Sequence, residues 1–450
     1  MKSFHALLLF FFLSTTFLFS QIDSFDISQY TLREVELKRL DFSASLGGNS
    51  QSISTTVNVG AFSSFSNTLG LGYSHFVSNS EFQKEAYFSL FNNFSFRNTG
   101  LFMGLASNDI VNNRTRAYII HTKRLYLEPK RFIDLTYDIN IENTLNSAVN
   151  NGGIRYLENQ LQLNFSIPLQ YGFGRIEPVT DAWHAVRILK DFKDLNILSR
   201  DPTQHEIKAL AKVLSNLAYD RIFDHRLARI RHIQILDEHI ASSGLVDKFD
   251  AVYFTSLYDM YQFGIQKDRF SGERFSFGLE PQGRVSSNSN SDNTGQTHKL
   301  YTLALLAVYD LNNPLSQKWQ FDFHASLRTG IEGGGTIVNS YFIKPEFSIS
   351  SAYYPNSRTS FEAQFRVSSR YATNPFFITS SNRFQYYSAL SGTFNYYLSP
   401  RTRLEANLVY QYAHNSYLGS VFGGITPIGG IFYNNGFNFN YGISIKHAIY

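Results

Sequence analysis

Asp322, His324 and Ser326 occupy alternate positions of one short segment and are the residue types of an acid–base–nucleophile triad. In such a triad the histidine lies within hydrogen-bonding reach of both partners. Alternate residues of a strand lie roughly 7 Å apart, since each residue advances it by about 3.3 Å. Direct proton transfer along this row is therefore excluded, and we interpret the three residues as part of a polar face. Single residues on adjacent strands would leave no local motif, so a hydrolase stays an alternative.

Three histidines at heptad spacing are a second set that could do chemistry. His225, His232 and His239 recur every seven residues in a segment with helical periodicity. Seven residues rise about 10.5 Å along a helix, so one ion could not bind two of these side chains. We interpret them as solvated or helix-contact residues and expect no metal and no cofactor. Arginines of the same segment indicate a salt-bridged surface or a face that docks a periplasmic protein: Arg221, Arg226, Arg229 and Arg231.

Other chemistry is argued against by what the sequence lacks. It has no G-x-S-x-G, H-E-x-x-H or S-x-x-K motif and no phosphate-binding glycine loop. The absence of cysteine excludes a thiol nucleophile, a thiolate zinc site and a disulfide framework. The net charge of +4 is small, and no cluster of basic and aromatic residues indicates nucleic-acid binding. We therefore expect a protein that is not an enzyme and binds no nucleic acid.

The charged residues stand instead at alternate positions of segments whose other positions are apolar. In residues 132–141, for example, Ile133, Leu135 and Tyr137 alternate with Asp134 and Asp138. This period of two predicts strands with one apolar and one wet face. The wet faces are predicted to line a lumen and to set its ion preference. The predicted lumen-lining residues are Asp134, Asp138, Asp322, His324, Arg328, Glu362, Arg366, Arg403 and Glu405.

Composition places these strands in a membrane. Aromatic residues make up 16% of the chain and charged residues 17%, against about 25% charge in a soluble domain. Residues 1–20 have the pattern of a cleaved signal peptide, with Lys2 before an apolar run, and no other stretch is long and apolar enough for a transmembrane helix. An exported membrane protein of this kind must be a β-barrel, because only closed barrels and helices satisfy their backbone in lipid.

Segment counting predicts about sixteen strands, with fourteen as the fallback. Eight begin near residues 41, 52, 68, 84, 100, 114, 131 and 154, and eight near 269, 297, 317, 340, 358, 383, 401 and 435. Long connections are expected at 283–296, 331–339, 373–383 and 415–434, alternating with tight turns. Since outer-membrane barrels have short periplasmic turns, parity puts residues 175–265 on the periplasmic side.

Residues 175–265 have helical periodicity and are predicted to form a four-helix bundle. The expected helices are 181–195 capped by Thr180, one opened by the capping box Thr203 to Glu206, then 220–241 and 246–263. The domain organisation is thus a signal peptide (1–20), a periplasmic lead-in (21–40), the first half of the barrel (41–174), the inserted helical domain (175–265) and the second half of the barrel (266–450).

The chain ends on an aromatic residue, Tyr450, after the alternating Phe437, Phe439, Tyr441 and Ile443. With the signal peptide and the strands, this resembles Gram-negative outer-membrane β-barrels of porin-like architecture. The resemblance implies an all-β, antiparallel transmembrane barrel in the bacterial outer membrane, surrounded by lipid and inserted by the barrel assembly machinery. The first hypothesis is a channel for small solutes, whose helical domain covers the inner mouth or docks a periplasmic partner. The alternatives are a structural component of an envelope or secretion complex and, third, the hydrolase.

Overall fold

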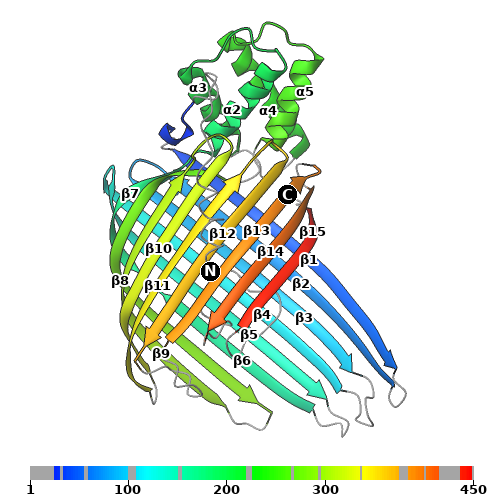
Figure 1. Ribbon diagram of the computed structural model, residues 1–450, viewed down its shortest axis with the longest axis vertical. Helices are drawn as coiled ribbons and strands as arrows, with labels where there is room; N and C mark the ends of the chain where they lie inside the picture. Colours follow the sequence, from blue (N-terminus) through cyan, green and yellow to red (C-terminus); the bar gives the residue numbers. More distant parts are fainter. Residues whose placement is uncertain are drawn as a thin grey trace, which may run out of the picture. The chain divides into compact units, whose positions relative to one another are not determined.

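The computed structural model describes residues 25–30, 34–54, 59–99, 108–149, 155–218, 225–264, 268–291, 295–334, 337–373, 384–399, 402–414 and 436–447. The chain divides into two compact units. One comprises Met1–Tyr30 and Val179–Lys267 and carries the α-helices, and the other comprises Thr31–Pro178 and Asp268–Tyr450 and carries the strands. A helical unit is thus inserted into the chain of a β unit (Figure 1).

The strands of the second unit form one antiparallel sheet in which, apart from β6 and β7, strands consecutive in the chain pair with each other, and the sheet curves into a barrel (Figure 1). The strands are β1 (Val35–Ser54), β2 (Val59–Ser78), β3 (Phe82–Thr99), β4 (Asn108–Glu128), β5 (Arg131–Val149), β6 (Arg155–Ser166), β7 (Leu169–Pro178), β8 (Phe270–Asn290), β9 (Gln296–Asn313), β10 (Trp319–Gly334), β11 (Ile337–Tyr353), β12 (Thr359–Ala372), β13 (Phe384–Tyr397), β14 (Thr402–His414) and β15 (Gly436–His447). The predicted antiparallel barrel is therefore confirmed as a class.

β6 and β7 occupy a single position in this sheet. Both pair with β5 and with β8. The register continues across the break, because Leu135 of β5 faces Leu169 while Asp138 faces Ser166. Pro168 lies between them and has no N–H to donate to the ladder, which interrupts the hydrogen bonding without shifting it. The described residues thus supply fifteen strands at fourteen positions, the number given as the fallback to sixteen.

Several expected segments differ from the strands observed. The segment expected at 52–62 spans the end of β1 and the start of β2, and the one at 100–107 lies outside the described residues. The long connection expected at 283–296 is wrong, since β8 continues to Asn290 and pairs with β9 along this stretch. Its serine and asparagine side chains do not prevent the backbone from pairing. The expected connection at 331–339 shortens similarly, whereas residues 374–383, 415–434 and Tyr450 lie outside the described part.

In the described residues of the inserted segment there are four α-helices: α2 (Thr180–Asp194), α3 (Gln204–Ala218), α4 (His225–Ser243) and α5 (Ala251–Phe263). The capping box is present, with the Glu206 amide donating to Thr203 Oγ1 over 3.3 Å and the Thr203 amide to Glu206 Oε2 over 2.8 Å. Thr180 was expected as a cap, but it is the first residue of α2. α5 begins later than expected, because Asp250 caps it by accepting from two amides and so fixes its start.

The apolar stripe of α2 forms the core of this unit. Trp183, Val186, Leu189 and Phe192 recur at helical spacing and are fully buried. The chain before β1 also contributes, since a short 3₁₀ helix, η1 (Ile27–Gln29), lies in the same compact unit as α2–α5. The expected lead-in of residues 21–40 is therefore not one segment: its described residues up to Tyr30 belong to the helical unit, and β1 already begins at Val35. Searching the described helices finds none with the length and apolar character to cross a membrane.

Candidate functional site

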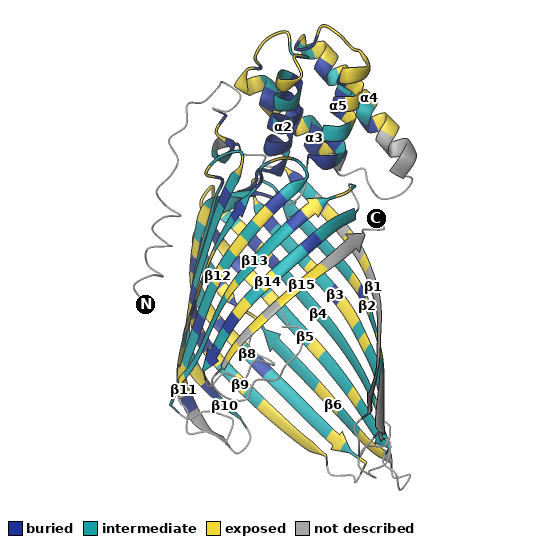
Figure 2. Cartoon of the chain, turned by 45° about the vertical axis from the view of Figure 1, so that its right-hand side comes forward, coloured by how far each residue is buried: buried dark blue, intermediate teal, exposed yellow. Residues whose placement is uncertain are grey.

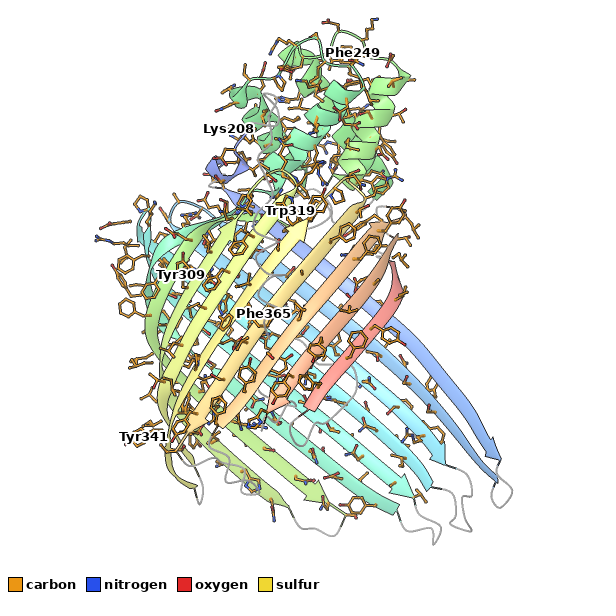
Figure 3. The ribbon with its side chains drawn as sticks, in the orientation of Figure 1. Lys208, Phe249, Tyr309, Trp319, Tyr341 and Phe365 are labelled. Carbon is orange, nitrogen blue, oxygen red and sulfur yellow. The ribbon has the colours of Figure 1, made fainter. Side chains whose placement is uncertain are left out.

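The inner face of the barrel collects the chemistry-bearing residues. Burial alternates along the strands (Figure 2), with apolar residues of one parity exposed on the outside. Phe365 is one of these outer residues, and Tyr341, with 66% of its surface exposed, is another (Figure 3). The residues of opposite parity point inward and are mostly polar. This alternation arises because successive side chains of a strand point to opposite faces.

A buried ion-pair network links β3, β4 and β5 on this inner face. Arg124 of β4 lies with Nε 2.7 Å from Asp134 of β5 and Nη1 2.6 Å from Glu85 of β3. Arg124 and Asp134 are 7% and 4% exposed, so their charges are shielded from bulk water. Further along β5, Asp138 accepts a hydrogen bond of 3.2 Å from the hydroxyl of Tyr118. Both predicted acids of β5 therefore face inward and are paired.

A second network links β8, β9 and β10. Asp310 of β9 accepts from Arg274 of β8 through Oδ2 over 2.8 Å, and its Oδ1 lies 2.7 Å from Nδ1 of His324 of β10. Asp322 lies two residues from His324 but has other partners. Its Oδ1 accepts from the amide groups of Asn312 and Gln320 over 2.8 and 2.7 Å. The histidine thus takes its carboxylate from the neighbouring strand.

The remaining predicted residues lie on β10, β12 and β14. Arg328 pairs with Glu280 of β8 over 2.9 Å, and Arg366 pairs with Glu346 of β11. Arg403 and Glu405 pair with each other over 3.1 Å. Glu362 lies directly opposite Thr393 of β13. The nine predicted residues are therefore spread around the wall, eight of them with the hydrogen-bond or ion-pair partners given above and Glu362 placed by its register.

Sequence analysis missed most of the partners in these pairs. The missed partners are Glu85, Arg124, Arg274, Glu280, Asp310 and Glu346. Each stands at the inward parity of its strand, so extending the alternation along every strand would have found them. The register between strands determines which charged residues become partners, and the sequence of a single segment does not contain the register.

One end of the interior is crossed by the end of β7. Beyond Phe173, β7 leaves β5 and pairs with β8 alone. At this point Gly174 of β7 and Gly272 of β8 have φ of +92° and +125°, a conformation that glycine tolerates best. The guanidinium of Arg175 then donates to Ser78 Oγ over 3.0 Å and to the Asn79 carbonyl over 2.7 Å.

These contacts join parts of the wall that are not neighbours. Ser78 ends β2, and three strands, β3, β4 and β5, lie between β2 and β7 in the sheet. The side-chain amide of Gln83, on β3, likewise donates to the Ile176 carbonyl over 2.9 Å. The guanidinium of Arg175 also lies over the ring of Tyr126, 4.4 Å from its centroid. The end of β7 thus makes contacts across β3, β4 and β5, at the end where it leads into the helical segment.

The residues singled out on the third predicted helix are only partly described. Arg231 is exposed on α4, the side chains of Arg226 and Arg229 are outside the described part, and so is Arg221 altogether. His232 is buried, with Nδ1 2.7 Å from the hydroxyl of Tyr261 on α5, and is thus a helix contact. Burial lowers the pKa of His239 below its ordinary value. Within the residues described, no group of three or more histidine or acidic side chains could hold a metal ion.

Comparison with known proteins finds similarity only among solved structures. No protein-family model and no curated protein matches the chain. The chain is similar to the translocator domain of the autotransporter NalP from Neisseria meningitidis, with 9% identity and a TM-score of 0.32 over 81% of this chain and 89% of that one. It is also similar to CdiB from Acinetobacter baumannii, with 9% identity and a TM-score of 0.30 over 93% of this chain and 61% of that one.

A third similar structure is the ferric yersiniabactin uptake receptor FyuA from Yersinia pestis, with 8% identity and a TM-score of 0.31 over 85% of this chain and 55% of that one. The chain thus spans less than two thirds of the length of CdiB and of FyuA. The matched structures are outer-membrane β-barrels, the architecture that the sequence resembles. The barrel fold of this chain follows from its own strand order and register, because similarities of this size do not establish which residues correspond.

Proposed function

We propose that the protein is a channel of the bacterial outer membrane that lets small solutes pass. The observation that carries the proposal is the contrast between the two faces of the sheet. The outer face exposes large apolar side chains such as Leu305 and Phe361, 60% and 47% exposed, as contact with lipid requires. Among the described side chains, the inner face bears arginines, acids and amides on β3–β5, β8–β12 and β14, which a dry packed core would not accommodate.

The pairing of the inner charges favours weak ion selectivity. On β10–β12 the arginines are each matched by a glutamate: Arg328 by Glu280, Arg366 by Glu346 and Arg370 by Glu332. Lys344, directly opposite Arg328, is a fourth cation, and the inward Asp322 of β10 and Glu362 of β12 raise the number of acids to five. The local charge is therefore close to neutral with a small negative excess, and the expected preference is slightly for cations.

Single-channel recording of the full chain in a planar lipid bilayer tests this proposal. We expect discrete conductance steps and, under a salt gradient, a reversal potential close to zero on the cation side. The crossing made by Arg175 predicts a conductance below that of an unobstructed barrel of this size. Silence of a correctly folded protein, verified by its strand signal in circular dichroism, would overturn the channel.

A structural role in an envelope or secretion complex is the second proposal. It is favoured by apolar side chains that the helical unit leaves exposed on α5 and just before it, namely Phe249, Val252, Phe254 and Tyr258. Figure 3 labels Phe249 on this unit. Several large apolar side chains exposed within one short segment are typical of protein contacts. A periplasmic protein that binds the full chain, and loses binding when Phe254 is replaced by Ser, would support this role.

A further inference from the structure

Five inward-facing residues form one row across five adjacent strands of the barrel. The register places Arg274 of β8 opposite Asp310 of β9, Asp310 opposite His324 of β10, and His324 opposite Ser348 of β11. Ser348 in turn lies opposite Arg366 of β12. A serine thus has a histidine on one side and an arginine on the other, and the histidine has an aspartate behind it.

The histidine in this row is oriented as a general base must be. Its Nδ1 is the atom that faces Asp310 Oδ1 at 2.7 Å, which leaves Nε2 on the opposite edge of the ring. Asp310 is held in turn by Arg274, which donates to its other oxygen over 2.8 Å. A carboxylate on Nδ1 fixes the ring and the tautomer in which Nε2 can accept a proton.

Ser348 is the residue whose hydroxyl proton His324 is placed to accept. It is the residue directly opposite His324 on the strand away from Asp310. The Cβ atoms of directly opposed residues lie about 4.5–5.5 Å apart, a separation that a serine hydroxyl and an imidazole can bridge. Such hydrogen bonds are often long before substrate binds. The His324 side chain is 39% exposed, so a solute inside the barrel can reach it.

Opposed residues of neighbouring strands lie closer together than alternate residues of one strand. Asp322 and Ser326 lie on the strand of His324, roughly 7 Å away along it, and Asp322 is occupied by Asn312 and Gln320. Neighbouring strands are only about 4.8 Å apart. An acid in contact with a base, and a serine directly opposite that base, therefore lie on three adjacent strands.

We propose that Ser348, His324 and Asp310 form a hydrolytic site for a carboxylic ester that enters the lumen, an activity beyond passive passage. The Ser348 oxygen attacks the ester carbonyl while His324 Nε2 takes the hydroxyl proton. The ester C–O bond then breaks, and the proton passes to the departing alkoxide, which leaves an acyl group on Ser348. Water repeats the two proton transfers and releases the acid. Arg366, whose guanidinium also pairs with Glu346, lies beside the serine, where the oxyanion develops, and Arg274 is a positioning residue.

A fluorophosphonate probe applied to the full chain in detergent micelles tests the site, with the modified residue located by mass spectrometry. We expect labelling at Ser348 that disappears in Ser348→Ala. His324→Gln should slow labelling by at least about 100-fold, the range of general-base catalysis. Ser350→Ala, two residues further on the same face, is the matched control and should label normally.

The outcome that overturns the proposal is a folded wild-type protein that does not label, or labelling at Ser348 that His324→Gln leaves unchanged. Turnover is read in parallel from hydrolysis of a p-nitrophenyl ester, which Ser348→Ala should abolish. The conductance of Ser348→Ala should equal that of the wild type. Failure of the hydrolytic site is thereby distinguished from failure of the channel.

Discussion

Replacing Arg124 by Met removes the cation that holds two acids of the inner wall together. Asp134 is 4% exposed and loses its ion partner at 2.7 Å, although Thr136 still donates to it over 2.8 Å. Breaking a buried pair from one side costs about 3–5 kcal/mol, because an uncompensated charge stays buried. Glu85 has a side chain that is 46% exposed, and its share of the loss is at most about 1 kcal/mol.

The double variant Arg124→Met, Asp134→Asn isolates the electrostatic part of this loss. The asparagine keeps an acceptor for Thr136 and removes the buried charge, so we expect about half of the lost stability to return, roughly 2 kcal/mol. Equilibrium unfolding in denaturant, followed by the strand signal in circular dichroism of the protein in lipid vesicles, measures both variants. A double variant no more stable than Arg124→Met would refute the reasoning and show that water screens this part of the wall.

Three further outcomes are expected. Lys344→Glu changes the four cations and five acids of this part of the wall to three cations and six acids, so the reversal potential should move further to the cation side. Arg175→Ala removes the side chain that reaches across to Ser78 and Asn79, so single-channel conductance should rise, with Lys130→Ala in the adjacent β4–β5 turn as a control that leaves it unchanged. The hydrogen bond from Arg200 lowers the pKa of Glu206 to about 2, below its value in an unfolded chain. Its contribution to helix α3 is therefore complete above about pH 4.5 and lost as the pH falls toward 2, and Glu206→Gln should flatten this part of an acid titration followed by helical circular dichroism.

The alternation of residue types was enough to predict which face of each strand is polar. Asp134, His324 and Arg366 all lie on the predicted inner face, because side-chain direction follows from a local period of two. The contacts of these residues depend on strand register, which arises from pairing between distant segments. Asp310, in a stretch that is otherwise apolar, was therefore not singled out, although it holds both Arg274 and His324.

Local competition explains where the boundaries of elements were misplaced. Thr180 is a favourable capping type, but the strand that ends at Pro178 leaves Val179 as the residue that flanks α2. Asp250 determines the start of α5 because its carboxylate accepts from the amides of Val252 and Tyr253. The Thr203–Glu206 capping box, whose signal lies within four residues, was found at the predicted place.

The burial of Phe25, Ile27 and Tyr30 in the helical unit has a consequence for chain entropy. These residues precede β1, whereas α2 follows β7, so the unit closes a loop that contains the first seven strands. It acts as a non-covalent cross-link between two distant points of the chain. A covalent link around a loop of about 100 residues removes roughly 4.7 kcal/mol of denatured-state entropy. As long as the helical unit stays folded, the unfolded half-barrel keeps its two ends together and starts each refolding attempt from a restricted ensemble.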